Sequence, residues 1–239
     1  CIGLRGAAGS GKSRIIYEFR RRKGRGLDSA TPCLAGRADP LAHVPYGLFV
    51  DLLRDITGIQ GEDSTPVRRR KLQALTRPLS LTDPTLKAYV PVIGHVLGIR
   101  YDDPQLEEAG PQSLQAEIHI ALTALLRAMA THVYKQFELP LIIQLFDIHA
   151  ADERSEAALL AILERLRSSV PLLIIATYRE GYRPPREVGL SSRFSQYSLG
   201  PLRRQDVSTL VASMLDGFTL PEGLLRRLSQ LSGGNPYFV

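Results

Sequence analysis

Five short segments along the chain predict β-strands from their apolar positions. Two of them, Leu141–Phe146 and Leu172–Thr177, are apolar at nearly every position, which is expected of strands covered on both faces of a parallel sheet. The other three are Cys1–Arg5, Cys33–Gly36 and Phe194–Leu199.

Between these segments, apolar residues recur at the three- and four-residue spacing of amphipathic helices. The pattern predicts helices at about residues 12–22, 46–58, 66–77, 84–97, 113–137, 155–167, 203–215 and 221–231. We expect Ser155 to cap the helix that it opens. Strands that alternate with helices imply a parallel sheet with right-handed crossovers, so we predict an α/β fold.

Composition places the chain among ordinary globular proteins. Of its 239 residues, 44% are hydrophobic and 23% are charged, and no run approaches the ~18 apolar residues that a membrane span needs. The two cysteines lack metal-type spacing, so we expect neither zinc nor a disulfide framework, and a reducing cytoplasm fits. The chain starts at Cys1 and ends abruptly after Val239, so we expect a piece of a longer protein.

The net charge of +6 is local rather than general. Residues 1–50 hold nine Lys and Arg against three Asp and Glu, and the remainder of the chain balances. The runs Arg20–Lys23 and Arg68–Lys71 are interpreted as solvated helix ends, with a contact surface for a partner or nucleic acid as the alternative. We expect no direct nucleic-acid binding by this fragment.

The segment directly after the first strand carries the clearest chemistry. It reads Gly6-Ala7-Ala8-Gly9-Ser10-Gly11-Lys12-Ser13. A glycine-rich turn lets backbone N–H groups point at a polyphosphate, and the helix that follows adds the positive end of its dipole. Lys12 would reach the β- and γ-phosphates, and the Ser13 hydroxyl would bind Mg²⁺. The segment therefore predicts a nucleoside triphosphate site.

One acid stands where such a site needs it, at the end of an apolar strand. A P-loop NTPase holds Mg²⁺ there with an Asp, and Asp147 is the acid in that place. Hydrolysing relatives carry two adjacent acids, whereas Phe146 and Ile148 flank Asp147. Either Asp147 binds the metal and no base follows, or it is the base and the metal loses its anchor. Both interpretations predict slow hydrolysis.

Three further side chains near strand ends have a functional and a plain interpretation. Asp152 is either a distant substitute for the missing acid or, as we favour, a helix-opening acid. His149 would contact a phosphate or position a water, but a hydrogen-bonded structural histidine is the plainer interpretation. Arg179 would pair with the γ-phosphate and report its presence, unless it is an ordinary surface arginine. Because ligands bind at the carboxyl ends of parallel strands, we expect Ser13, Asp147 and Thr177 to converge.

Several segments together resemble the signal-transducing AAA-type ATPases with numerous domains (STAND). The nearest subgroup is the regulatory ATPase module fused to class III adenylate or guanylate cyclases, LuxR-type transcription activators and serine/threonine kinases. In that subgroup the strand end reads Glu-Asp-Leu-His-Trp-Ala-Asp, and Phe146–Asp152 keeps all but the Glu, the Leu and the Trp. The segments that carry the resemblance are Gly6–Ser13, Leu141–Asp152, Pro171–Arg179, Pro201-Leu202 and Ser232–Val239.

The resemblance implies a P-loop NTPase of the AAA/STAND type, a three-layer α/β/α core with a parallel sheet. We expect this core over residues 1–200 and the beginning of a helical lid domain over residues 201–239. ATP and Mg²⁺ are the implied ligands. Asp147 and Arg179 are the candidate catalytic residues, and Ser13 and Asp147 would hold the metal. The family's Gly-Asn-Pro motif matches residues 234–236, which implies that Pro236 packs near the adenine.

The implied function is a switch in a multidomain signalling protein. ATP would hold the lid against the core, and ADP or an inducer would change that packing and act on a fused effector domain. Self-association stays open, and hydrolysis would be slow or absent.

Two rival functions remain at this stage. A working P-loop kinase would need an acceptor site and an acid pair, and a motor ATPase would need an arginine acting in trans, for which Arg183, Arg186 and Arg193 are available. The second rival function is that of a degenerate scaffold that no longer binds nucleotide. The intact Lys12 and Ser13 argue against it.

Overall fold

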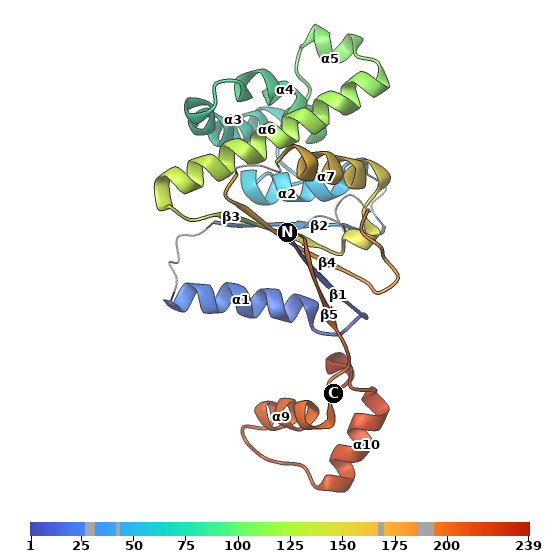
Figure 1. Ribbon diagram of the computed structural model, residues 1–239. Coiled ribbons are helices and arrows are strands. Elements are labelled where there is room, and N and C mark those ends of the chain that lie inside the picture. Colours follow the sequence, from blue (N-terminus) through green and yellow to red (C-terminus); the bar gives the residue numbers. More distant parts are fainter. Residues whose placement is uncertain (27–31, 42–43, 167–169, 186–193) are drawn as a thin grey trace.

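The computed structural model describes residues 1–26, 32–41, 44–166, 170–185 and 194–239 (Figure 1). Its strands form one sheet in the order β2-β3-β4-β1-β5, and each adjacent pair runs parallel. The predicted parallel sheet is confirmed, and each strand lies within one residue of its predicted bounds. The strands are β1 (Ile2–Gly6), β2 (Cys33–Arg37), β3 (Leu141–Phe146), β4 (Leu172–Tyr178) and β5 (Ser195–Leu199).

Helices cover both faces of the sheet, which gives the expected three-layer α/β/α arrangement (Figure 1). Helix α1 (Lys12–Gly26) lies on one face, and α2 (Gly47–Thr57) and α7 (Glu153–Arg165) lie on the other. The core is unequal between the two faces, because the α2 and α7 side holds the larger buried cluster. The smaller cluster on the α1 side consists of Leu4, Ile16, Ile142 and Ile175.

A helical insertion separates β2 from β3. After α2 it contains α3 (Thr65–Thr82), α4 (Leu86–Val96), α5 (Pro104–Glu108) and α6 (Pro111–Phe137), stacked beyond α2 on the side away from α1 (Figure 1). The larger buried cluster continues from the sheet through this insertion. Within the described part of the chain, no helix is both long enough and apolar enough to cross a membrane.

The basic run Arg68–Lys71 lies near the start of α3 and is partly engaged. The Arg68 guanidinium donates to the carbonyls of Gly61 at 2.7 Å and Asp63 at 2.9 Å. Lys71 pairs with the Asp63 carboxylate at 2.6 Å. These contacts pin the loop before α3 to the helix. The prediction of a solvated helix end is therefore wrong at Arg68 and Lys71.

Helix α7 begins two residues earlier than the sequence pattern predicts. Asp152 is its N-cap, and the Asp152 carboxylate accepts hydrogen bonds from the Ser155 N–H at 3.0 Å and the Ser155 hydroxyl at 2.5 Å. It also accepts the N–H groups of Tyr46 and Gly47, each at 3.0 Å. Ser155 as the cap is wrong, because a carboxylate has enough acceptor sites to serve two chain segments. The favoured interpretation of Asp152 as a helix-opening acid is confirmed.

The chain ends in a small group of helices beyond β5. They are α9 (Arg204–Met214), α10 (Glu222–Ser232) and the short 3₁₀ helix η2 (Pro236–Phe238), and they lie below the sheet in Figure 1. The Leu202 N–H donates to the carbonyl of Gly234 at 2.7 Å, which returns the end of the chain to the exit of β5. Gly234 has a φ of 73°, a conformation that favours glycine.

Candidate nucleotide-binding site

The loop between β1 and α1 has the backbone of a phosphate cradle. Gly9 and Gly11 have φ values of 78° and 92°, which residues with a Cβ rarely adopt. A Cβ on Gly6 would come within 2.6 Å of the Ser10 hydroxyl. The turn closes through a hydrogen bond from Ser10 N–H to the carbonyl of Ala7 at 3.2 Å. Glycine at these positions is therefore a requirement of the loop's shape.

Lys12 lies across this loop instead of extending into solvent. Its ammonium donates to the carbonyl of Gly6 at 2.8 Å and that of Ala7 at 2.7 Å, and only 8% of the residue is exposed. Burial lowers the pKa of Lys12, the negative charge of Asp147 opposes this shift, and Arg179 adds to it. The lysine and both candidate catalytic residues therefore share one electrostatic environment.

Asp147 is held by two residues at the ends of the adjacent strands, Thr177 of β4 and Arg37 of β2. Its backbone is in the left-handed region at a φ of 58°, and its N–H donates to the Thr177 hydroxyl at 3.0 Å. The carboxylate accepts a hydrogen bond from Arg37 at 2.8 Å in an ion pair. The Arg37 guanidinium also lies over the Phe146 ring, 4.9 Å from its centre. Phe146 thus supports the cation that pairs with Asp147.

Sequence reasoning missed Arg37. The residue ends β2, and its β-sheet partner on β3 is Phe146. The predicted strand ended at Gly36, so Arg37 lay just outside it and was not assigned to the sheet. The register of the sheet is what turns it into a partner of Asp147.

Asp147, His149 and Arg179 line one cavity of about 340 Å³. His149 lies in the 3₁₀ turn η1 (Ile148–Ala150), and its Nδ1 is buried without a hydrogen-bond partner in the described residues. Burial lowers the pKa of His149, although Asp147 opposes the shift. The prediction of a hydrogen-bonded structural histidine is therefore not met at this nitrogen. Arg179 is exposed at the end of β4.

Two acids that the sequence did not single out line the same cavity, Asp39 and Asp51. The Asp51 carboxylate accepts the Arg37 N–H at 2.8 Å, and the Asp39 carboxylate accepts the Leu41 N–H at 2.9 Å. Asp39 lies in the loop after β2, and Asp51 lies within α2, so only the packing of α2 beside the sheet brings the two acids to one cavity.

The C-terminal segment lies directly on the phosphate loop. The Asn235 side chain donates from Nδ2 to the carbonyl of Ala8 at 2.9 Å. A Cβ on Gly9 would lie 2.7 Å from both Asn235 Oδ1 and Tyr237 Cβ. Pro236 follows within the short helix η2. The structure therefore brings residues 235–237 to residues 8–9, and Asn235 makes the contact.

Comparison with known protein families decides the identity of this fold. The AAA ATPase domain family matches residues 1–175 of the chain. The chain belongs to the AAA ATPase domain family. Membership implies nucleotide binding, typically together with Mg²⁺.

Two solved structures similar to this AAA ATPase chain were also found. One is a Signal Transduction ATPase with Numerous Domains (STAND) protein with a tetratricopeptide repeat sensor from Pyrococcus horikoshii, 14% identical, covering 98% of this chain and 26% of that chain at a TM-score of 0.44. The other is Drosophila ORC bound to GC-rich DNA and Cdc6, 13% identical, covering 100% of this chain and 70% of that chain at a TM-score of 0.36. The chain spans about a quarter of the STAND protein. The search of curated proteins gave no match.

The residues of this AAA ATPase site fit a nucleotide with Mg²⁺. Mg²⁺ in such sites keeps several waters and takes one or two protein ligands beside the phosphate oxygens, so the Ser13 hydroxyl and the Asp147 carboxylate suit it. Ser13 is exposed in the first turn of α1. Among the described residues, no group of three His, Cys, Asp or Glu side chains is placed to hold a metal by itself.

The basic residues considered for other roles are less informative. Arg183 is exposed. Arg186 and Arg193 lie outside the described residues. In the run Arg20–Lys23, Arg20 and Arg21 are exposed on α1, and the side chains of the other two lie outside the description.

Proposed function

We propose that this AAA ATPase chain is an ATP-binding regulatory switch module that hydrolyses ATP slowly or not at all. In this proposal residues 1–200 are the NTPase core and residues 201–239 begin a helical lid. The loop Gly6–Ser13 binds the phosphates, and Ser13 and Asp147 bind Mg²⁺. Arg179 senses the γ-phosphate, and Pro236 lies near the adenine.

The observation that carries slow turnover is the ion pair between Arg37 and Asp147. Activation of water needs a carboxylate that is free to take a proton. The Asp147 carboxylate is paired at 2.8 Å, and its neighbour Phe146 stacks under Arg37 and supplies no acid. Asp152 is no substitute, because its carboxylate accepts hydrogen bonds from three backbone N–H groups and a hydroxyl.

The observation that supports a switch is the contact of Asn235 with the phosphate loop. A switch needs an element whose contacts differ between two ligand states. Occupation of the loop by a triphosphate or a diphosphate acts on the backbone of residues 6–11, and the Ala8 carbonyl within it holds the Asn235 amide. The lid would therefore respond to the state of the nucleotide.

We further propose that the module belongs to a cytoplasmic signalling protein of the STAND class, fused to an effector such as a cyclase, a transcription regulator or a kinase. The resemblance of residues 146–152 and 232–239 to that subgroup supports this assignment. Self-association would be one way to transmit the switch.

An actively hydrolysing AAA ATPase is the second candidate function. Asp39 and Asp51 favour it, since both line the cavity that holds Asp147. Either carboxylate would then act as the base that position 146 lacks. An Asp51→Asn variant that abolished phosphate release would support this second candidate.

The test measures binding and turnover together. We expect ATP and ADP to bind the unmutated chain and to bind far more weakly to Lys12→Ala. We expect steady-state phosphate release below ~1 s⁻¹, under the enzyme median of ~10 s⁻¹. Turnover well above that value would replace the switch with the second candidate. If the unmutated chain bound no nucleotide, both candidate functions would be refuted, and the degenerate scaffold that no longer binds nucleotide would remain.

A further inference from the structure

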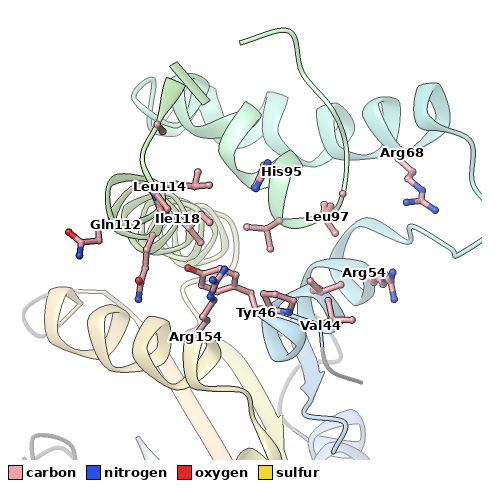
Figure 2. Close-up of a pocket in the computed structure, with 17 residues that line it drawn as sticks. Val44, Tyr46, Arg54, Arg68, His95, Leu97, Gln112, Leu114, Ile118 and Arg154 are labelled. Atoms are coloured by element: carbon pink, nitrogen blue, oxygen red, sulfur yellow. The ribbon is translucent and has the colours of Figure 1, made fainter. Parts of the chain in front are cut away.

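A second, larger cavity lies within the helical insertion. It has a volume of about 620 Å³ and is lined by residues of α2 and the segment before it, of α3, of the end of α4 and of the starts of α6 and α7 (Figure 2). We call it the insertion cavity. Sites for small molecules typically measure about 300–1,000 Å³. Its apolar lining includes Val50, Leu97, Leu114 and Ile118, so the insertion cavity has the size and lining of a site for an organic molecule.

The charged side chains of the insertion cavity are all basic. They are Arg54, Arg68 and Arg154, and the lining residues in the described part of the chain include no Asp or Glu. Arg54 and Arg154 make no ion pair or side-chain hydrogen bond with any residue that the structure describes. Figure 2 shows Arg54 and Arg68 on the same side of the cavity. This distribution favours an anion over a cation or a neutral molecule.

Two features fix the arrangement in advance. The Arg68 guanidinium is oriented by the Gly61 and Asp63 carbonyls, which leaves its remaining N–H groups for another acceptor. Tyr46 is 4% exposed and has a φ of 60°, which is unusual for a bulky residue, and Asp152 holds its N–H. A site whose cation and wall are both held by the fold loses little freedom on binding.

We propose that the insertion cavity binds a small organic anion. Carboxylate or phosphate groups would pair with Arg54 and Arg68 on one side of the cavity and with Arg154 on the other, because guanidinium groups bind such oxygens bidentately (Figure 2). The apolar body would lie against Tyr46, Leu97 and Ile118. This site is separate from the phosphate loop, and its assignment does not depend on whether the chain hydrolyses ATP.

The test uses two fluorescent probes that share one aromatic body. The first, 1-anilinonaphthalene-8-sulfonate, carries a sulfonate, and the second, N-phenyl-1-naphthylamine, is its neutral analogue. We expect the sulfonate to bind the unmutated chain at one site and the double variant Arg54→Gln/Arg154→Gln about tenfold more weakly or worse, as expected for losing charge-assisted hydrogen bonds. The neutral probe would bind both alike. Arg70→Gln is the matched control, since Arg70 is an exposed residue of α3 that does not line the cavity.

A second variant tests the location independently of charge. Gln115 lines the cavity from α6, so Gln115→Trp would occupy part of the space and weaken binding of both probes. Thermal unfolding checks that each variant is folded, and Ala109→Phe at the same cavity replaces Gln115→Trp if that variant does not fold. Equal sulfonate affinity in the unmutated chain and the double variant would overturn the proposal. The proposal would also be overturned if the sulfonate bound Gln115→Trp and Ala109→Phe as tightly as it binds the unmutated chain.

Discussion

Asn235 and Ala8 are 227 positions apart in the sequence and meet through a 2.9 Å hydrogen bond from the side-chain amide to the backbone carbonyl. The contact joins the end of the chain to the loop proposed to bind phosphate. The same Asn235 side chain accepts the Tyr237 N–H at 3.0 Å, so one residue both shapes the short helix η2 and anchors it. The Asn235 side chain therefore links the backbone of the loop to the C-terminal helices.

The first prediction concerns this anchor. Asn235→Ala removes two hydrogen bonds, together worth about 2 kcal/mol, so local opening of residues 235–239 should become about thirtyfold more frequent. Amide hydrogen exchange measures it. ADP should change the exchange of these residues in the unmutated chain, and that response should shrink in Asn235→Ala. Gln230→Ala is the control. If ADP changes the exchange of residues 235–239 equally in Gln230→Ala and Asn235→Ala, the hydrogen bond of Asn235 does not carry the signal.

The second prediction concerns the ion pair at the strand ends. Arg37→Ala frees the Asp147 carboxylate, so Mg²⁺ should support ATP binding at a lower concentration. A titration of ATP affinity against Mg²⁺ measures this shift. The control is Arg204→Ala, which breaks an ion pair of similar length, 2.9 Å to Glu222, on the proposed lid. If Arg37→Ala leaves the Mg²⁺ dependence unchanged, Asp147 is no metal ligand.

The third prediction adds an acid beside Asp147 through the variant Phe146→Glu. It removes the ring under Arg37 and restores an acid beside Asp147, so the guanidinium would have two carboxylates to pair with. We expect a stronger dependence of nucleotide binding on Mg²⁺ and a higher rate of phosphate release. Unchanged values for both in a folded Phe146→Glu protein would remove the argument from the missing acid.

The sequence predicted the sheet well because buried parallel strands are apolar at nearly every position, as in Leu141–Phe146. The sequence pattern predicted the ends of helices less well, as at the helix that contains Pro78. The helix that was expected to stop at residue 77 continues through Pro78 to Thr82, since packing of Leu79 and Ser80 into the insertion outweighs the loss of one N–H. Helix α5 was not predicted, because a helix of five residues is too short to show the three- and four-residue spacing of apolar positions.

The candidate site was predictable where a motif is local and not where it depends on packing. The segment Gly6–Ser13 is continuous in sequence, so its role was visible. The partnership of Arg37 with Asp147 depends on strand register, and the place of Asn235 on Ala8 depends on how the last helices return to the loop. Neither follows from hydrophobic pattern. The insertion cavity is likewise a product of helix packing.

The pH dependence of stability should report on Asp152. Burial acts to raise the pKa of Asp152, but hydrogen bonds from Ser155, Tyr46 and Gly47 outweigh it and hold the pKa below its usual value. A lowered folded-state pKa stabilises the protein above the unfolded-state value of about 3.9, and this contribution is lost as pH falls through the folded-state pKa. Chemical unfolding at pH 7 and pH 3 should show that Asp152→Asn is less stable at pH 7 and loses less on acidification. Glu62 is an exposed acid of the helical insertion, and in the control variant Glu62→Gln the loss of stability on acidification should match that of the unmutated chain.

The last prediction separates backbone strain from contact at the phosphate loop. Gly9 and Gly11 both have a positive φ, so alanine at either position should lower the free energy of unfolding by about 1–2 kcal/mol. Only at Gly9 would the new Cβ lie within 2.7 Å of Asn235 and Tyr237, whereas at Gly11 it would meet nothing within 4 Å.

Gly9→Ala should therefore release residues 235–239, with faster amide exchange there, and Gly11→Ala should leave their exchange unchanged. Thermal unfolding of both variants without nucleotide gives the shared cost of strain, and amide exchange gives the difference. Equal exchange of residues 235–239 in the two variants would mean that the C-terminal segment does not rest on Gly9 in solution. The proposed path from nucleotide to lid would then have to leave the loop elsewhere.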